Sequence, residues 1–187
     1  MNLYQGCQGL MLLEGEKLEN VPGDPGKLTK NGVTQKSYDA FCDSKKLTRQ
    51  SVALMTAAET ADLYGQDYWE PAGCPELTDG LDFIHFQWAV NHGVSSSLRC
   101  LKLAIYGRPQ LGDVDGPLNA KDLSELKKWG VTGLVQERYL AIQSATYDRI
   151  AQAHAAGEAP GLLKFFNGWE NRIQRVRDIV AGRPLSV

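Results

Sequence analysis

The stretch DGLDFIHFQWAVN, residues 79–91, decides the fold. Apolar side chains occupy nearly every turn of it and leave little polar face, which predicts a central, buried helix. Gly93 follows and predicts the end of that helix. A helix buried in this way needs partners, and the rest of the chain is typical of a mostly helical protein.

On the C-terminal side, a serine among residues 95–97 is expected to cap the next helix. Pro117 fits the first turn of a further helix. Residues 131–155 predict a long helix, and Pro160 is expected to begin the last one, in which apolar residues recur at helical spacing.

On the N-terminal side, residues 3–13 predict a short helix that Gly15 ends. Residues 15–34 collect glycine, proline, aspartate and asparagine, which predicts a loop or a hairpin with short strands. Thr48 is expected to cap a helix that continues to about Tyr64. The sequence thus predicts a mostly α protein with a small α+β part.

The composition limits the function classes. The 187 residues are 43% apolar and 22% charged, which is typical of one globular domain, or of one domain in two lobes, and excludes disordered, collagen-like and coiled-coil chains. The net charge of −2 argues against nucleic-acid binding. Residues 1–90 carry 7 basic and 13 acidic side chains, and residues 91–187 carry 13 basic and 9 acidic ones. This asymmetry indicates two surfaces with different partners, unless it is a chance imbalance.

Membrane insertion and metal binding are not expected. No stretch approaches the about 18 apolar residues of a membrane-spanning helix, and the first residues lack the pattern of a secretory signal. The cysteines are too scattered for a metal or redox motif and are expected to be free thiols. The histidines have no zinc-like spacing. These residues are Cys7, Cys42, Cys74, Cys100, His85, His92 and His154.

Two carboxylates and a hydroxyl form the candidate catalytic set. Glu14 ends the first predicted helix, Asp24 lies ten residues later in a tight turn, and Thr29 follows. Glycosidic hydrolysis needs a proton donor for the leaving oxygen and a second group that holds a water or the sugar cation. These three residues could supply both parts, although a solvated glutamate at a helix end is the ordinary alternative.

Several motifs in the same order resemble glycoside hydrolase family 108, a family of N-acetylmuramidases that are often phage endolysins. The motifs are Glu14-Gly15, Asp24-Pro25-Gly26, Thr29, Gly32-Val33-Thr34, Asp67-Tyr68-Trp69-Glu70-Pro71 and Trp88-Ala89-Val90-Asn91-His92-Gly93. Further motifs resemble the family's predicted peptidoglycan-binding C-terminal region. They are Leu98 to Leu103, Asp115-Gly116-Pro117 and Gly168-Trp169-Glu170-Asn171-Arg172-Ile173.

The resemblance implies a lysozyme-like α+β fold, with a catalytic lobe over residues 1–75 packed on a helical lobe over residues 76–187 as one compact unit. It implies cleavage of the β-1,4 bond between N-acetylmuramic acid and N-acetylglucosamine in bacterial peptidoglycan, with Glu14 as the general acid. Asp24 and Thr29 would orient the water or stabilise the developing positive charge. No metal or organic cofactor is implied.

The resemblance also implies where the protein would act. A phage enzyme of this kind would be made in the host cytoplasm without a signal peptide, and would reach the cell wall through a holin or another route. The alternative from a different class is a non-catalytic wall-binding or virion structural protein that kept the fold. A helical module whose acidic and basic halves bind protein partners is a second alternative.

Two departures from the family pattern lie beside the candidate catalytic residues. Glu16 and Lys27 stand where the family has glycine. A helix C-terminus carries about half a negative charge, which raises the pKa of a carboxyl group there. Glu16 and Glu19 would add to this effect, and a raised pKa suits a general acid.

Aromatic and amide side chains in the motifs are candidates for sugar binding. Tyr68 and Trp69 could stack on sugar rings, and Asn91 could hydrogen-bond to a sugar or to the end of its own helix. Large aromatic residues are also the ordinary constituents of a core. Arg172, Arg175 and Arg177 could meet an anionic wall polymer, with a solvated helix face as the default.

Overall fold

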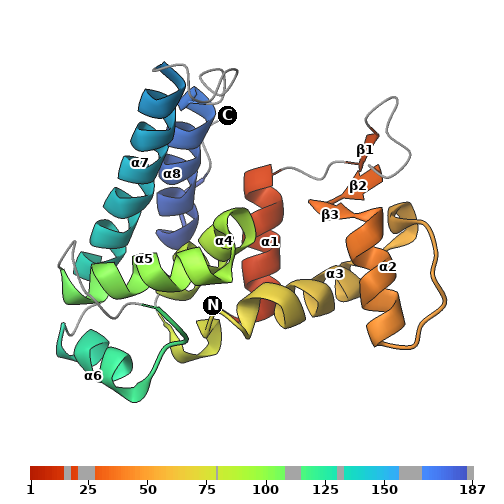
Figure 1. Ribbon diagram of the computed structural model, residues 1–187, viewed down its shortest axis with the longest axis horizontal. Helices are drawn as coiled ribbons and strands as arrows, with labels where there is room; N and C mark the ends of the chain where they lie inside the picture. The colour runs from red at the N-terminus through yellow and green to blue at the C-terminus, as the bar shows by residue number, and fades with distance from the viewer. Residues whose placement is uncertain are drawn as a thin grey trace.

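A buried helix lies at the centre of the molecule. The computed structural model describes residues 1–14, 18–20, 28–78, 80–107, 115–129, 133–155 and 166–184, with the backbone alone at 14, 18–20, 154–155, 166–167 and 170. Helix α4 (Leu81–His92) is buried from Leu81 to Ala89 and contacts helices on several sides (Figure 1). The helix predicted from the DGLDFIHFQWAVN stretch is therefore confirmed, and Gly93, at φ 84°, ends it.

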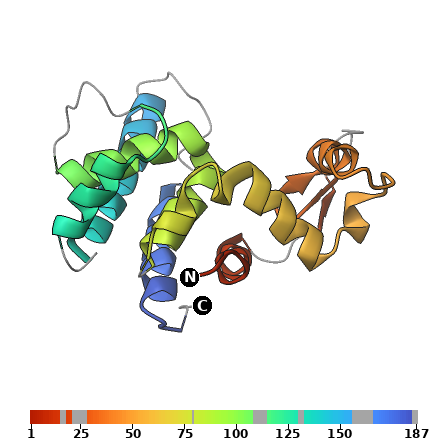
Figure 2. The same cartoon turned by 90° about the horizontal axis from the view of Figure 1, so that it is seen from below.

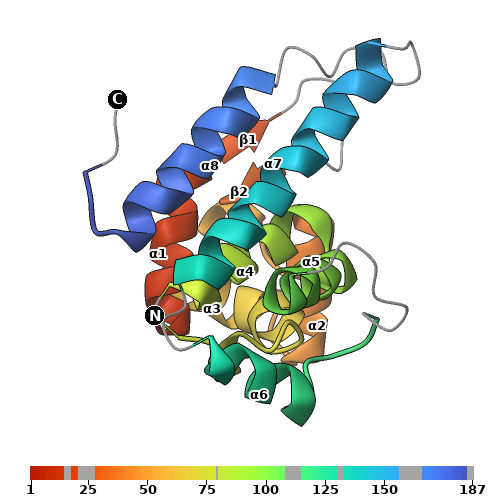
Figure 3. The same ribbon diagram turned by 90° about the vertical axis from the view of Figure 1, so that its left-hand side faces the viewer.

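Four helices form the C-terminal part of the fold around α4. They are α5 (Val94–Tyr106), α6 (Ala120–Lys128), α7 (Gly133–Ala155) and α8 (Phe166–Val180). Helices α7 and α8 pack side by side, and α5 contacts α4, α6 and α7 (Figure 3). A buried ion pair of 3.4 Å between Lys102 and Asp122 holds α6 against α5.

Helix α1 (Leu3–Glu14) lies between the C-terminal helices and the small sheet, as Figure 2 shows end-on. It contacts α3, α4 and α8. Two glycines let it approach the core closely, because a Cβ at Gly6 would lie 2.9 Å from the Trp69 ring and a Cβ at Gly9 would lie 2.6 Å from the Phe83 ring. Glu14 is the last residue of this helix.

The N-terminal part completes the fold with a three-stranded antiparallel sheet in the order β1-β2-β3. The strands are β1 (Leu18–Asn20), β2 (Leu28–Lys30) and β3 (Val33–Thr34), and β3 leads directly into α2 (Gln35–Ser44). The hairpin predicted between residues 15 and 34 is thus present. Lys30 anchors the sheet by donating hydrogen bonds to the carbonyls of Ala53 and Met55, at 2.9 and 2.8 Å.

The segment between the sheet and α4 consists of short helices. It holds η1 (Val52–Leu54), α3 (Ala57–Tyr64), the π-helix η2 (Gly65–Trp69) and η3 (Cys74–Glu76). The predicted helix from Thr48 was wrong at its start, since α3 begins after Thr56. Thr56 and Glu59 form a capping box there, which satisfies backbone N–H groups that Thr48 could not reach.

Two further predicted helix starts differ from the structure. The serines at 95–97 lie inside the first turn of α5, which begins at Val94 directly after Gly93. Pro117 precedes α6, whose cap is Asn119. The Asn119 side-chain oxygen accepts hydrogen bonds from the backbone N–H groups of Lys121 and Asp122. Asn119, and not Pro117, therefore determines where α6 begins.

The fold class predicted from the sequence, mostly α with a small sheet in a lysozyme-like α+β arrangement, is confirmed. The division at residue 75 stays a prediction, although α1 from the first part contacts α4 and α8 from the second. Within the described part of the chain, no helix is long and apolar enough to cross a membrane.

Candidate functional site

The candidate catalytic glutamate lies at the end of α1. Leu10 and Leu13, which precede it, are 3% and 7% exposed and anchor the last turn of α1 in the core. Glu14 closes the helix, and β1 begins four residues later at Leu18. The anchored turn fixes the backbone position of Glu14.

An arginine of the last helix caps this end of α1. Arg175 Nη1 donates a hydrogen bond to the carbonyl oxygen of Leu13 at 3.3 Å, and Nη2 donates to the carbonyl oxygen of Leu12. The last carbonyls of a helix lack partners within the helix and carry partial negative charge, so a cation there is stabilising. Arg175 offsets the charge of the helix end. The helix dipole alone is thus a weaker reason to expect a raised pKa for Glu14 than the sequence indicated.

The predicted hydroxyl lies in the middle strand of the sheet. Thr29 is half-exposed in β2 and pairs with Glu19 of β1 on one side and Thr34 of β3 on the other. Asp24 lies outside the described residues. The structure therefore places Glu14 and Thr29 on two elements that follow each other in the chain, the end of α1 and the hairpin.

The predicted amide connects α4 to α8. Asn91 is exposed near the end of α4, and its amide oxygen, turned toward α8, accepts hydrogen bonds from Nε and Nη2 of Arg172, both at 2.8 Å. Arg172 Nε also lies 3.2 Å from Oε1 of Gln87. Arg172 and Arg175 are three residues apart and share a face of α8. This face of α8 therefore contacts both the end of α4, through Asn91, and the end of α1, through the carbonyls of Leu12 and Leu13.

The two predicted aromatic residues differ in accessibility. Trp69 is 4% exposed and packs edge-on against Phe86, with ring centroids 5.2 Å apart, so the structure places it in the core, where its ring leaves little surface for a sugar. Tyr68 is half-buried and its ring lies 5.8 Å from that of Tyr64. The Tyr64 hydroxyl donates to the carbonyl of Asn31 at 2.6 Å, which links this aromatic pair to the β2–β3 turn.

An aromatic stack that the sequence did not indicate extends from the end of α4. His92 stacks on Trp88 with centroids 3.6 Å apart, and Tyr147 packs edge-on against Trp88 and stacks on Trp169 at 5.0 Å. Burial, with a smaller contribution from the charge of Arg172, lowers the pKa of His92 from 6.5 to about 4. A neutral, stacked His92 is therefore expected at neutral pH.

A separate cavity lies between α5 and α7, away from the residues predicted to be catalytic. Among the described residues, no group of three or more histidine, cysteine, aspartate or glutamate side chains is arranged to hold a metal ion. The three last-helix arginines singled out in the sequence have internal partners. Arg172 meets Asn91, Arg175 meets α1, and Arg177 donates to Glu137 at 3.0 Å.

Comparison with known proteins supports the sequence resemblance over the first half of the chain. Residues 8–93 match the model of the family described as Glycosyl hydrolase 108. The predicted family resemblance and the prediction of a glycoside hydrolase are therefore confirmed over these residues. The C-terminal motifs lie beyond the match, and the peptidoglycan-binding role that they suggest stays a prediction.

The fold is also found in a solved structure. The structure of Brucella abortus SagA superposes with a TM-score of 0.69 at 22% sequence identity, and the match covers 96% of this chain and 94% of that one. At this identity the similarity concerns the fold. No curated protein matches the chain.

Proposed function

We propose that this chain, whose residues 8–93 match glycosyl hydrolase family 108, is a peptidoglycan hydrolase that cleaves the β-1,4 bond between N-acetylmuramic acid and N-acetylglucosamine. The observation that supports this function best is the position of Glu14. It ends a helix anchored in the core and lies directly before the hairpin that carries Thr29.

The proposed chemistry uses the chain's own side chains. Glu14 in its protonated form donates a proton to the leaving glycosidic oxygen, as general acid catalysis requires. Asp24 and Thr29 orient the attacking water or stabilise the positive charge that develops on the sugar. Whether the product inverts or retains its configuration depends on the separation of the two carboxylates.

The deciding experiment compares Glu14→Gln with a matched surface glutamate. Glutamine keeps the size of the side chain but cannot donate the proton, so release of dye from labelled peptidoglycan should fall by about 10²–10⁴-fold. Glu76 is exposed in η3, and Glu76→Gln should keep the wild-type rate. If Glu14→Gln kept more than about a tenth of the rate, against the expected loss, Glu14 would not be the acid and Glu16 would be tested next.

The two other candidate catalytic residues give a graded series. Asp24→Asn should cost as much as Glu14→Gln if Asp24 is the base or nucleophile, and less if it only orients water. The loss of activity in Thr29→Ala should be intermediate. Thr29→Ser should retain more activity than Thr29→Ala because the hydroxyl remains. Melting temperatures of all variants separate lost chemistry from lost folding.

The bond that is cleaved is identified by the products. Mass spectrometry of the fragments should show reducing N-acetylmuramic acid ends, and activity should persist in EDTA. Products in which the peptide is cut from the sugar would overturn the muramidase proposal. Glu16 and Lys27 favour the alternative of a non-catalytic wall-binding protein, for which wild type would bind peptidoglycan without any release of fragments.

The route to the wall is a separate part of the proposal. We propose that a holin releases the protein to the wall. Expression of the protein inside bacteria should then lyse the cells only when a holin is expressed with it. Lysis by the protein alone would show another route.

A further inference from the structure

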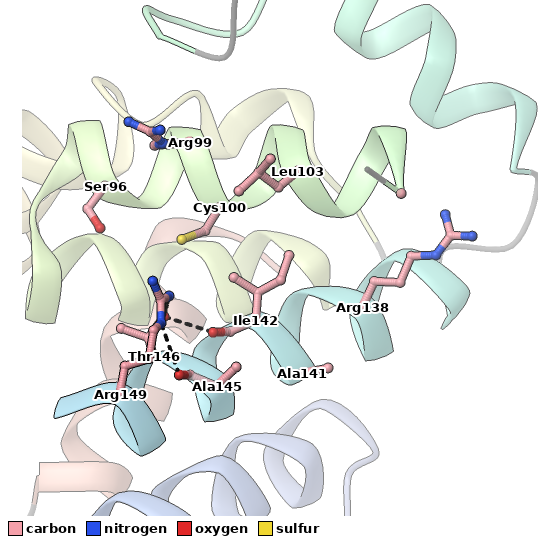
Figure 4. Close-up of a pocket in the computed structure, with 11 residues that line it drawn as sticks. Ser96, Arg99, Cys100, Leu103, Arg138, Ala141, Ile142, Ala145, Thr146 and Arg149 are labelled. Atoms are coloured by element: carbon pink, nitrogen blue, oxygen red, sulfur yellow. Dashed lines mark hydrogen bonds between the residues drawn. The ribbon is translucent and has the colours of Figure 1, made fainter. Parts of the chain in front are cut away.

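A cavity with a volume of about 730 Å³ lies between α5 and α7, and this volume is in the range of sites that bind small molecules. Figure 4 shows its lining on the two facing helices. The described residues that line it include neither Glu14 nor Thr29, so the cavity is separate from the residues predicted to be catalytic. We call this cavity the α5–α7 groove.

One end of the groove is polar and positively charged. Ser96 and Arg99 of α5 lie there together with Thr146 and Arg149 of α7 (Figure 4). Burial raises the pKa of the Cys100 thiol, whereas the nearby charges of Arg149 and Arg99 lower it, so both guanidinium groups are close to the middle of the groove. No acidic side chain is found among the described lining residues. This end of the groove therefore favours an anion.

The two arginines at this end are held only weakly. Arg149 is exposed, and the hydrogen bonds that its guanidinium makes to described residues stay within α7, at the carbonyl of Ala145 and the hydroxyl of Thr146. Arg99 lies 3.9 Å from Asp115, and both side chains are well exposed at 61% and 88%, so this pair is weak. Both cations can therefore turn to an anionic ligand at little cost.

The other end of the groove is apolar and closed. Its apolar lining consists of Leu103, Ala141 and Ile142. Arg138 closes this end and does not face a ligand, because its guanidinium stacks 4.4 Å from the ring centre of Trp129. The same guanidinium packs on Gly107, where an added Cβ would lie 3.0 Å from Nη1. The groove thus has a cationic end and a closed apolar end.

The length of the groove indicates the size of its ligand. Thr146 and Arg138 are eight residues apart on α7, which is about 12 Å along a helix axis. An extended chain of about ten carbon atoms, joined by bonds of about 1.5 Å, has the same length. A molecule with an anionic head group and one alkyl chain therefore matches the groove in charge, polarity and length.

We propose that the α5–α7 groove binds a medium-chain fatty acid, with the carboxylate at Arg99 and Arg149 and the alkyl chain along the apolar lining. The two arginines select an anion over a neutral or cationic amphiphile. The apolar end selects an alkyl chain over a compact anion or a sugar phosphate, whose polar groups would be left without partners there. This site goes beyond the proposed hydrolysis, because its ligand is not the polymer that is cleaved.

The ligand class is tested by calorimetric titration of the full chain with sodium decanoate below its micelle concentration. We expect saturable binding of one decanoate per chain. Each CH₂ group removed, from decanoate to octanoate to hexanoate, should weaken binding by about two- to fourfold. Decanol and decyltrimethylammonium have the same chain without the anionic head group and should bind at least about tenfold more weakly. Equal binding of either one, or no dependence on chain length, would overturn the proposal.

The cationic end is tested by substitution. Arg149→Gln should weaken decanoate binding by about three- to tenfold, because it removes one exposed charged partner. The double variant with Arg99→Gln should lose more. Arg49→Gln is the matched control, because Arg49 is 60% exposed, as Arg99 is at 61%, but pairs with Asp43 of α2. It should bind as wild type does, and an equal loss in this control would overturn the proposal.

The apolar end is tested by filling it. Ala141→Trp places a large side chain in the groove and should reduce decanoate binding by about tenfold or more, since the chain then loses several buried CH₂ groups. Ala58→Trp is the control at an exposed alanine of α3 and should bind as wild type does. Melting temperatures show that both variants fold. Undiminished binding in Ala141→Trp would place the ligand elsewhere and overturn the assignment to this groove.

The location is tested independently through Cys100, whose sulfur lies between the two helices. Saturating decanoate should slow alkylation of Cys100 in wild type, and the same concentration should not slow it in Ala141→Trp. An unchanged rate in wild type would overturn the proposed site. Binding to vesicles of phosphatidylglycerol without binding of monomeric decanoate would replace the fatty acid with a membrane surface and would likewise overturn the proposal.

Discussion

Arg175 of α8 donates a hydrogen bond to the carbonyl oxygen of Leu13, the residue before the candidate catalytic glutamate, across 162 positions of the sequence. The last helix therefore holds the end of the first one in place. A side chain that acts through the backbone in this way is a positioning residue. Its effect on catalysis should differ from that of Glu14.

Arg175→Met should lower turnover by about tenfold, because it removes charged hydrogen bonds to the end of α1. It should also move the alkaline limb of the pH–rate profile to higher pH, since loss of a nearby cation raises the pKa of a carboxylic acid. Arg175→Lys should restore part of the profile. Arg177→Met, which removes only the contact with Glu137, should leave the profile unchanged. An unchanged alkaline limb in Arg175→Met would show that this cation does not influence the acid.

Gly9→Ala should destabilise the protein although alanine favours helices. The added Cβ would lie 2.6 Å from the ring of Phe83, which is fully buried and cannot move aside. Overpacking costs about 1–3 kcal/mol, against a helix-propensity gain of about 1 kcal/mol. We expect a net loss on urea unfolding. Gly168→Ala is the matched control in α8, where none of the described residues comes within 4 Å of the added Cβ, and it should be neutral or stabilising.

Acid should destabilise the fold through His85. Its Nε2 lies 2.9 Å from the carbonyl of Ala72 and its Nδ1 lies 2.8 Å from the hydroxyl of Tyr139. Burial lowers the pKa of His85 from 6.5 to about 4. Between these two pH values the His85 side chain binds a proton in the unfolded chain but not in the folded one. The stability that is present above pH 6.5 is therefore lost as the pH falls toward 4.

The size of this effect is on the order of 2–3 kcal/mol. It is measured as the difference between the pH dependence of unfolding of wild type and of His85→Gln. The variant should be less stable at pH 7 and should lose less on acidification. Parallel slopes for the two proteins would contradict the assignment to His85.

Cys100 should react first among the four cysteines with an alkylating reagent. It is half-buried, whereas Cys7, Cys42 and Cys74 are buried. Burial raises the pKa of the Cys100 thiol, so the reaction should be slow at neutral pH and accelerate as the pH rises. Burial likewise raises the pKa of Cys7, to about 11. Mass spectrometry of digested protein measures the order, and labelling of Cys7 or Cys74 before Cys100 would contradict it.

Local sequence patterns predicted the elements whose signal lies within one turn or one hairpin. The helix of residues 79–91 was predictable because apolar side chains lie on nearly all of its faces. The hairpin of residues 15–34 was predictable because turn-forming residues gather there. Helix α2 was not predicted, because its three buried residues, Tyr38, Phe41 and Cys42, stand among polar ones. The start of α3 could have been found from the Thr56 and Glu59 capping box.

The candidate site also contains residues that a local sequence motif indicated and residues that it did not. Glu14 and Thr29 were proposed from local motifs, and their catalytic roles stay predictions. The roles of Arg175 and Arg172 come from contacts between distant helices, for which the sequence contains no local signal. Trp69 was named for its motif, yet it is buried, and its ring packs so closely on α1 that a Cβ at Gly6 would lie 2.9 Å from it.

The hydrogen bonds between Arg175 of α8 and the end of α1 limit which segments of this protein can be exchanged with those of another. Lytic enzymes built as separate modules can exchange their wall-binding parts freely. Here an exchange that replaced everything after α4 would leave the carbonyls of Leu12 and Leu13 without their guanidinium and Asn91 without its partner. A functional chimaera would therefore have to retain α8 together with α1 and α4.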